Sequence, residues 1–236
     1  MQELRTEPRQ RRSQQSIDSI LDAAERLIHD QGQVAFTAKE LADEAGMSIG
    51  RVYYWYKDIP SVVTALVERS THRLVHLFTE SVARQAGKGL SDRIQNVIAD
   101  LCGYVDDNPA TVALCLTGGA VSPGESLSDQ LVHYVALLVR DRVPGISEPE
   151  TLIVARTAVG IMLGMLSGYS TAGDERPLIQ QELVYVLGAY MFSRFPPPDD
   201  DVWTRPAHTV QPARPARIDD MVTRTLLWPA LAPDQH

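Results

Sequence analysis

Two short helices on either side of a glycine, in residues 37–57, constrain the fold of this chain more than any other feature. Thr37 and Glu40 have the spacing of a capping box, in which each side chain accepts a hydrogen bond from the backbone N–H of the other. The helix that begins there must be short, because Gly46 suits a turn with positive φ and Ser48 is a good N-cap for a following helix. Two short helices joined by a tight turn form a helix-turn-helix.

A longer amphipathic helix precedes this pair. Apolar residues from Ile17 to Ile28 recur with the period of one helical face, and Gly32 suits a C-terminal cap, so a helix is predicted over residues 16–31. Beyond Pro60, helical periodicity continues between proline and glycine breaks and predicts about six more helices, with no strand-like alternation. The predicted fold class is therefore all-α, with about nine helices: an N-terminal three-helix domain that contains the helix-turn-helix, and a larger helical domain.

Composition divides the 236 residues into four predicted segments. Residues 1–15 form a basic N-terminal arm, 16–59 the helix-turn-helix domain, 60–195 the larger helical domain and 196–236 a tail with more than half of the 15 prolines. The arm could reach a neighbouring minor groove or remain a solvated terminus. The tail contains apolar residues, so we expect it to dock onto the helical domain, with disorder or capture of another protein as alternatives.

Any contact with nucleic acid must come from a local basic patch, because Asp and Glu outnumber Lys and Arg by 30 to 22 and the net charge is -8. Between residues 46 and 57 the only charged residues are Arg51 and Lys57, and both are basic. The second helix of a helix-turn-helix lies in the major groove, where the guanidinium of Arg51 could bond a guanine edge in bidentate fashion. Gly50 would allow close approach of the backbone, while Tyr53, Lys57 and the helix starts suit phosphates.

The segment from Phe36 to Asp58 resembles the N-terminal signature of the TetR (tetracycline repressor) family, and the resemblance covers roughly residues 15–66. The family pattern is met at Thr37, Leu41-Ala42, Ala45-Gly46-Met47-Ser48, Gly50, Val52-Tyr53 and Tyr56. The resemblance implies that a homodimer binds palindromic double-stranded operator DNA. The predicted DNA-binding residues are Thr37, Lys39, Ser48, Ile49, Gly50, Arg51, Tyr53, Tyr54, Trp55 and Lys57.

Two positions depart from the family pattern, which usually has Phe at the place of Tyr56 and a Lys where this chain has Ile59-Pro60. Without that lysine, Lys57 or Arg51 would have to contribute more to phosphate binding. Trp55 could donate its indole N–H to a phosphate, or it could be a core tryptophan.

The resemblance also implies that residues 60–195 bind a small-molecule effector and dimerise through a four-helix bundle built from the last two helices. Independently, Gly160, Gly164 and Gly168 recur every four residues on one helical face, which would let a partner backbone approach closely. The alternative is that these glycines pack inside one protomer. The predicted dimer-interface residues are Gly160, Gly164, Gly168, Leu183, Leu187 and Tyr190.

Polar residues on apolar helical faces are the candidates for the effector site. Arg156 lies in the least polar helix and, if buried, must be paired; we favour an ion pair within the chain or across the dimer, with an anionic ligand as the alternative. The predicted ligand-binding residues are Cys102, Tyr104, His133, Tyr134, Arg156 and Met162. Ordinary core or surface placement is the alternative for each of the others.

Other functional classes receive little support from the sequence. Cys102 and Cys115 have no CxxC partner, so neither a metal site nor a cofactor is predicted. The start of the chain is polar, and the most apolar stretch, 152–169, is shorter than the ~20 residues of a membrane span, so a cytoplasmic protein without membrane contact is predicted. We predict a ligand-responsive repressor that is not an enzyme. The alternatives are a regulator that acts through protein partners or needs a corepressor and, more distantly, a helical enzyme that uses His76, His133, Cys102 or Cys115.

Overall fold

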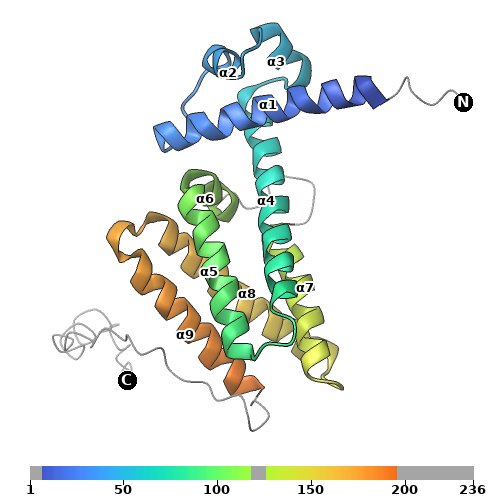
Figure 1. The fold of residues 1–236 in the computed structure, drawn as a ribbon, viewed down its shortest axis with the longest axis vertical. Coiled ribbons are helices and arrows are strands. Elements are labelled where there is room, and N and C mark those ends of the chain that lie inside the picture. The colour runs from blue at the N-terminus through green and yellow to red at the C-terminus, as the bar shows by residue number, and fades with distance from the viewer. Residues whose placement is uncertain (1–6, 118–125, 196–236) are drawn as a thin grey trace, which may run out of the picture. The chain divides into compact units, whose positions relative to one another are not determined.

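The computed structural model of the protein describes residues 7–117 and 126–195, and every regular element in that part of the chain is helical (Figure 1). The elements are α1 (Glu7–Gln31), α2 (Ala38–Glu44), α3 (Ile49–Trp55), α4 (Ile59–Arg84), α5 (Leu90–Asp107), α6 (Pro109–Thr117), α7 (Leu127–Arg142), α8 (Glu148–Thr171), the 3-10 turn η1 (Gly173–Glu175) and α9 (Arg176–Arg194). The predicted all-α fold with about nine helices is thus confirmed within these ranges. The predictions for residues 1–6 of the arm and for the tail, 196–236, lie outside them.

The first helix extends further toward the N-terminus than predicted. It begins at Glu7 and not at residue 16, so much of the segment predicted as an arm is helical. The added stretch contains a proline in its first turn and is otherwise rich in Arg and Gln, which are good helix formers. Apolar periodicity marks only the part of a helix that faces a core, and so it could not reveal this polar extension.

Local chemistry defines the short helices as the sequence predicted. The Thr37 hydroxyl accepts a hydrogen bond from the Glu40 backbone N–H at 3.2 Å, and the Thr37 N–H donates to Glu40 Oε2 at 2.7 Å. These hydrogen bonds from Thr37 also lower the pKa of Glu40, so the capping box is intact at neutral pH. Gly46 has a φ of 65° and turns the chain between the two helices. The capping box and the glycine turn are therefore confirmed.

The N-terminal domain has its own hydrophobic core. Ile20 of α1, Leu41 of α2 and Val52 of α3 are almost fully buried and pack together with residues of α4. The packing fixes the side of α3 that faces inward. It thereby determines which side chains α3 presents outward.

Helix α4 contributes to two cores and so links the N-terminal domain to the larger one (Figure 1). Leu66, in its first half, has no exposed surface and packs in the N-terminal core, whereas Phe78, in its second half, packs in the larger core. Arg69 adds a polar connection, because its two terminal nitrogens lie 2.6 Å from Asp22 Oδ1 and 2.7 Å from Glu25 Oε2 of α1. A displacement of α4 would therefore be felt by α1.

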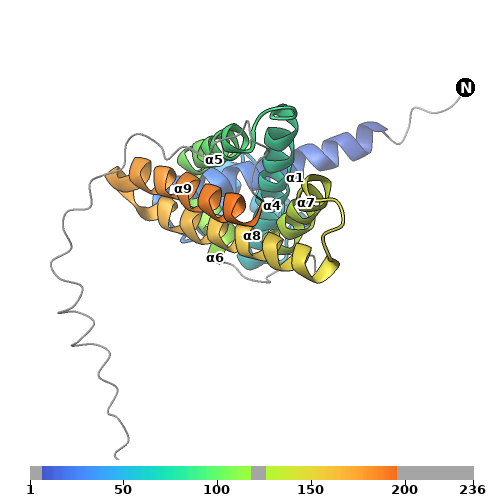
Figure 2. The same ribbon diagram turned by 90° about the horizontal axis from the view of Figure 1, so that it is seen from below.

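In the larger domain, α8 packs between α7 and α9, and α8 and α9 lie side by side (Figure 2). Ser147 caps α8 by accepting a hydrogen bond from the Glu150 N–H at 3.4 Å, as its spacing predicted. By length and composition alone α8 could cross a membrane. The prediction that it is buried holds for one side, which includes Val154 and Met162, but Ile153 on the other side is 57% exposed.

Candidate functional site

The outer face of α3 presents a group of polar and aromatic side chains. Val52 is 2% exposed and points into the core, whereas Tyr53 and Tyr54 are 53% and 77% exposed. Ile49, Gly50 and Arg51 are also exposed. This division follows from the helical period, and it places the candidate base-reading residues on one accessible surface.

Arg51 is held by α1 through a contact that the sequence did not predict. Its Nη2 donates to Ser16 Oγ at 2.7 Å, across a groove between α1 and the turn that is lined in part by Gln15, Met47 and Ser48. No sequence signal joins two residues 35 positions apart in this way. A guanidinium has five N–H donors, so Arg51 retains donors for a second partner while this bond is in place.

The predicted phosphate-binding residues differ in how free their polar atoms are. Lys57 is 83% exposed, and its Nζ lies 4.0 Å from Asp58 Oδ2. Lys39 and Ser48 are exposed, and the Ser48 side chain makes no capping bond. The hydroxyl of Thr37, in contrast, already donates to Glu40 Oε2 at 2.8 Å. Thr37 would therefore have to give up that bond to donate to a phosphate.

Trp55 belongs to the core of the N-terminal domain more than to its surface. The indole is half-buried against the apolar cluster and meets the ring of Tyr54 edge-on, with 4.9 Å between the ring centroids. Its Nε1 is buried and has no hydrogen-bond partner among the described residues. The expected donation to a phosphate is thus not available in this arrangement, because the aromatic body of the side chain fills the core.

The six predicted dimer-interface residues fall into two groups. Gly160, Gly164 and Gly168 lie exposed on the outer side of α8, and a Cβ added to any of them would meet nothing within 4 Å. Leu183 and Leu187 are 0% and 7% exposed and belong to the core of the single chain, and Tyr190 is half-buried against it. The prediction for α9 was wrong at the two leucines, because the most apolar stripe of that helix is used within the protomer.

The predicted ligand-binding residues do not converge on one site. His133, Tyr134 and Arg156 are exposed, and Arg156 makes no ion pair within residues 7–117 and 126–195. Cys102 is buried in the core, and Tyr104 is half-buried beside Arg73. The ion pair expected for Arg156 inside the chain is thus absent from the described part, while a partner across a dimer stays a prediction.

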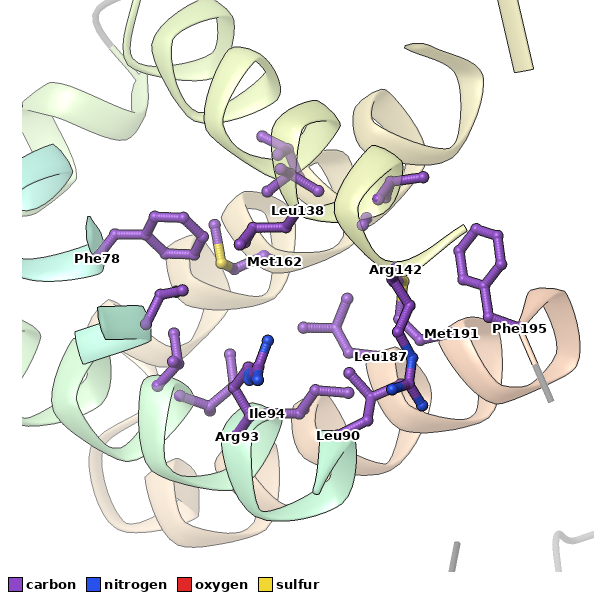
Figure 3. A pocket seen from close by; sticks show the side chains of 17 residues that line it. Phe78, Leu90, Arg93, Ile94, Leu138, Arg142, Met162, Leu187, Met191 and Phe195 are labelled. Carbon is purple, nitrogen blue, oxygen red and sulfur yellow. The ribbon is translucent and has the colours of Figure 1, made fainter. Parts of the chain in front are cut away.

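A cavity of about 130 Å³ lies instead among α4, α5, α7, α8 and α9, and of the six predicted residues only Met162 lines it (Figure 3). Sequence reasoning missed the others, because apolar residues that line a cavity look the same in a sequence as those that fill a core. The residues of its wall that Figure 3 labels are Phe78, Leu90, Arg93, Ile94, Leu138, Arg142, Met162, Leu187, Met191 and Phe195. Among all the lining residues, Arg93 and Arg142 are the ones with charged side chains.

Both cysteines should react slowly with Ellman's reagent at pH 8 in the native protein. Burial raises the pKa of Cys102 to about 12 and that of Cys115 to about 11, so the reactive thiolate is scarce at this pH. Between pH 9 and 11 the unfolded chain loses these protons and the native chain keeps them, so the free energy of unfolding should fall as pH rises. Guanidinium-denatured protein, in which both thiols react at once, is the control. Rapid native labelling would contradict the buried placement.

Comparison with known proteins identifies the N-terminal region. The sequence model of the family described as "Bacterial regulatory proteins, tetR family" matches residues 20–65. A helix-turn-helix-type transcriptional regulator of Mycobacterium tuberculosis is 28% identical over 182 residues, which cover 75% of this chain and 88% of that protein. A similar regulator of Xanthobacter autotrophicus is 21% identical over 164 residues, which cover 68% and 80% of the two chains.

Solved structures share the fold of the whole described chain. A TetR-family transcriptional regulator from Streptomyces coelicolor has a TM-score of 0.57 and 20% identity, with 76% of this chain and 99% of that chain covered. Thermus thermophilus FadR, a TetR-family transcriptional repressor in complex with lauroyl-CoA, has a TM-score of 0.52 and 16% identity, with 82% and 99% covered. At these identities the likeness extends to the fold.

Proposed function

The chain is a regulator of the TetR family, and on that premise we propose that it represses transcription as a cytoplasmic homodimer. In this proposal the dimer binds a palindromic operator and leaves it when a small molecule enters the cavity of the larger domain. The α3 surface carries the proposal: Arg51 and Lys57 stand there beside two tyrosines that are more than half exposed. Exposed aromatic side chains next to cations are typical of a surface that meets a partner.

The open face of α8 supports a dimer. Three glycines spaced by four residues lower the helix propensity by ~1 kcal/mol each, yet nothing in the single chain occupies the space above them. A partner helix could approach this face closely. A two-fold dimer would present two α3 helices to two half-sites about one helical turn, ~34–36 Å, apart or further.

Helix α4 supports coupling between the cavity and the DNA-binding surface. Phe78 lines the cavity, while Leu66 and Arg69 of the same helix contact the N-terminal domain. A ligand that fits one position of α4 better than another would favour one separation of the two α3 helices. By linkage, the ligand and the operator would then weaken each other's binding by the same factor. The lauroyl-CoA complex of the Thermus protein supports a small-molecule effector for this fold.

Arg51→Ala should weaken binding to the preferred operator about tenfold. A bidentate contact to guanine gives ~1–3 kcal/mol of discrimination, and we expect the lower end because Arg51 exchanges its bond to Ser16 for the base. The operator would first be selected from a random duplex pool, and affinities would then be measured by fluorescence anisotropy at several salt concentrations. Arg140→Ala, an exposed arginine of α7 in the larger domain, is the matched control.

A palindromic consensus with a steep negative dependence of log K on log salt would support operator binding. If the pool yields no enriched sequence and Arg51→Ala binds DNA as the wild type does, the proposal of a base-reading α3 fails. The regulator would then act through a protein partner or require a corepressor.

A further inference from the structure

The wall of the cavity is apolar except at two arginines. Arg93 comes from the first turns of α5 and Arg142 from the last turn of α7, and the remaining lining residues are aliphatic, aromatic or methionine side chains (Figure 3). A ligand bound here would thus meet hydrocarbon over most of its surface. Its polar group would have to face the two guanidinium groups.

Both guanidinium groups lack an acidic partner in the described part of the chain. Other arginines there are paired with carboxylates, as Arg69 is with Asp22 and Glu25, but neither Arg93 nor Arg142 forms an ion pair within the described ranges. The Nε of Arg93 is buried and has no hydrogen-bond acceptor among these residues. Removing a cationic donor from water without an acceptor is unfavourable, so an anion at this place would satisfy it.

The size of the cavity limits the hydrocarbon part of the ligand. Its volume of about 130 Å³ is close to that of an engineered protein cavity of ~150 Å³ that binds benzene, so it holds an apolar group of about six carbons. Met162 and Met191 line it, and their flexible side chains can adapt to a chain of somewhat different shape. Two or three further carbons would carry an anionic group from the apolar interior to the arginines.

We propose that the cavity binds an amphipathic carboxylate, an aliphatic acid of about eight carbons whose carboxylate is held by Arg93 and Arg142. The inference rests on the proposed function in taking this cavity as the effector site. It adds the ligand class, since the guanidinium geometry suits a carboxylate in bidentate contact and the wall suits an unbranched alkyl chain.

Isothermal titration calorimetry of the full chain with octanoate, 1-octanol and butanoate tests the proposal. Octanoate should bind more tightly than either other probe, since octanol lacks the charge and butanoate lacks the chain length. Arg93→Met/Arg142→Met keeps the apolar stems and should raise the Kd for octanoate about tenfold or more, with the Kd for octanol unchanged. Leu138→Trp, which fills the cavity, should weaken both eight-carbon probes.

Arg140→Met is the matched control: it removes the same charge from the same last turn of α7 but lies outside the cavity wall. Equal Kd values for octanoate and octanol in the wild type, or an unchanged octanoate Kd in the double variant, would overturn the proposal. Because calorimetry uses protein without DNA, the two proposals can fail separately. Octanoate binding without any operator binding would remove the proposed function, and operator binding without octanoate binding would remove only the ligand class.

Discussion

Gly164→Leu should convert the protein to a monomer and weaken operator binding by at least about 100-fold. The added side chain has room in the single chain, where a Cβ at residue 164 meets nothing within 4 Å, and leucine favours the helix over glycine. In the proposed dimer the same side chain would hold the two α8 helices apart. Binding of the second half-site would then no longer be intramolecular, and that advantage is worth ~10²–10⁴ in affinity. Analytical ultracentrifugation and anisotropy titrations give the two measurements.

Gly103→Leu provides the matched control, because Gly103 is also an exposed helical glycine with nothing within 4 Å of an added Cβ, but it lies on α5. This variant should remain dimeric and bind the operator normally. A dimeric Gly164→Leu protein with wild-type affinity would show that the glycine face of α8 is not the interface.

Leu66→Ala should lower the free energy of unfolding by about 3 kcal/mol. Leu66 has no exposed surface and lies where α4 packs into the N-terminal core, so its truncation leaves a cavity there. For a chain of this size the melting temperature should fall by about 6–12 °C. Circular dichroism melts at one fixed protein concentration measure it, since dimerisation makes Tm depend on concentration.

The same substitution at Leu137 controls for the chemistry of the change. Leu137 lies on α7 and is 46% exposed, so Leu137→Ala should alter the free energy of unfolding by less than about 0.5 kcal/mol. Equal losses in the two variants would contradict the burial of Leu66.

Features that depend on neighbouring residues could be predicted from the sequence, whereas features that depend on packing could not. The capping box of Thr37 and Glu40 and the positive φ of Gly46 are determined within a few residues, and both were found as predicted. The start of α1 at Glu7 could not be seen, because that turn carries no apolar period. The partition of α9 also required the structure, since a stripe of leucines does not indicate which neighbour it packs against.

The candidate sites show the same contrast. The outward residues of α3 follow from the helical period once Val52 is known to be buried, and only Trp55 among them turned inward with its polar atom. The search for an effector site looked for polar residues on apolar helices. The cavity is assembled from helices far apart in the sequence and is mainly apolar, so Arg93 and Arg142 could be recognised only after the helices were placed.

The hydrogen bond between Arg51 and Ser16 affects how strictly a DNA sequence can be judged. A guanidinium without an internal partner would be stranded over a mismatched base, and the mismatch would cost the full desolvation of that group. Here Ser16 provides a resting position, so a wrong base forfeits the contact without stranding the cation. The difference in binding free energy between a perfect and an imperfect half-site narrows accordingly, and a regulator of this design tolerates a graded series of operators.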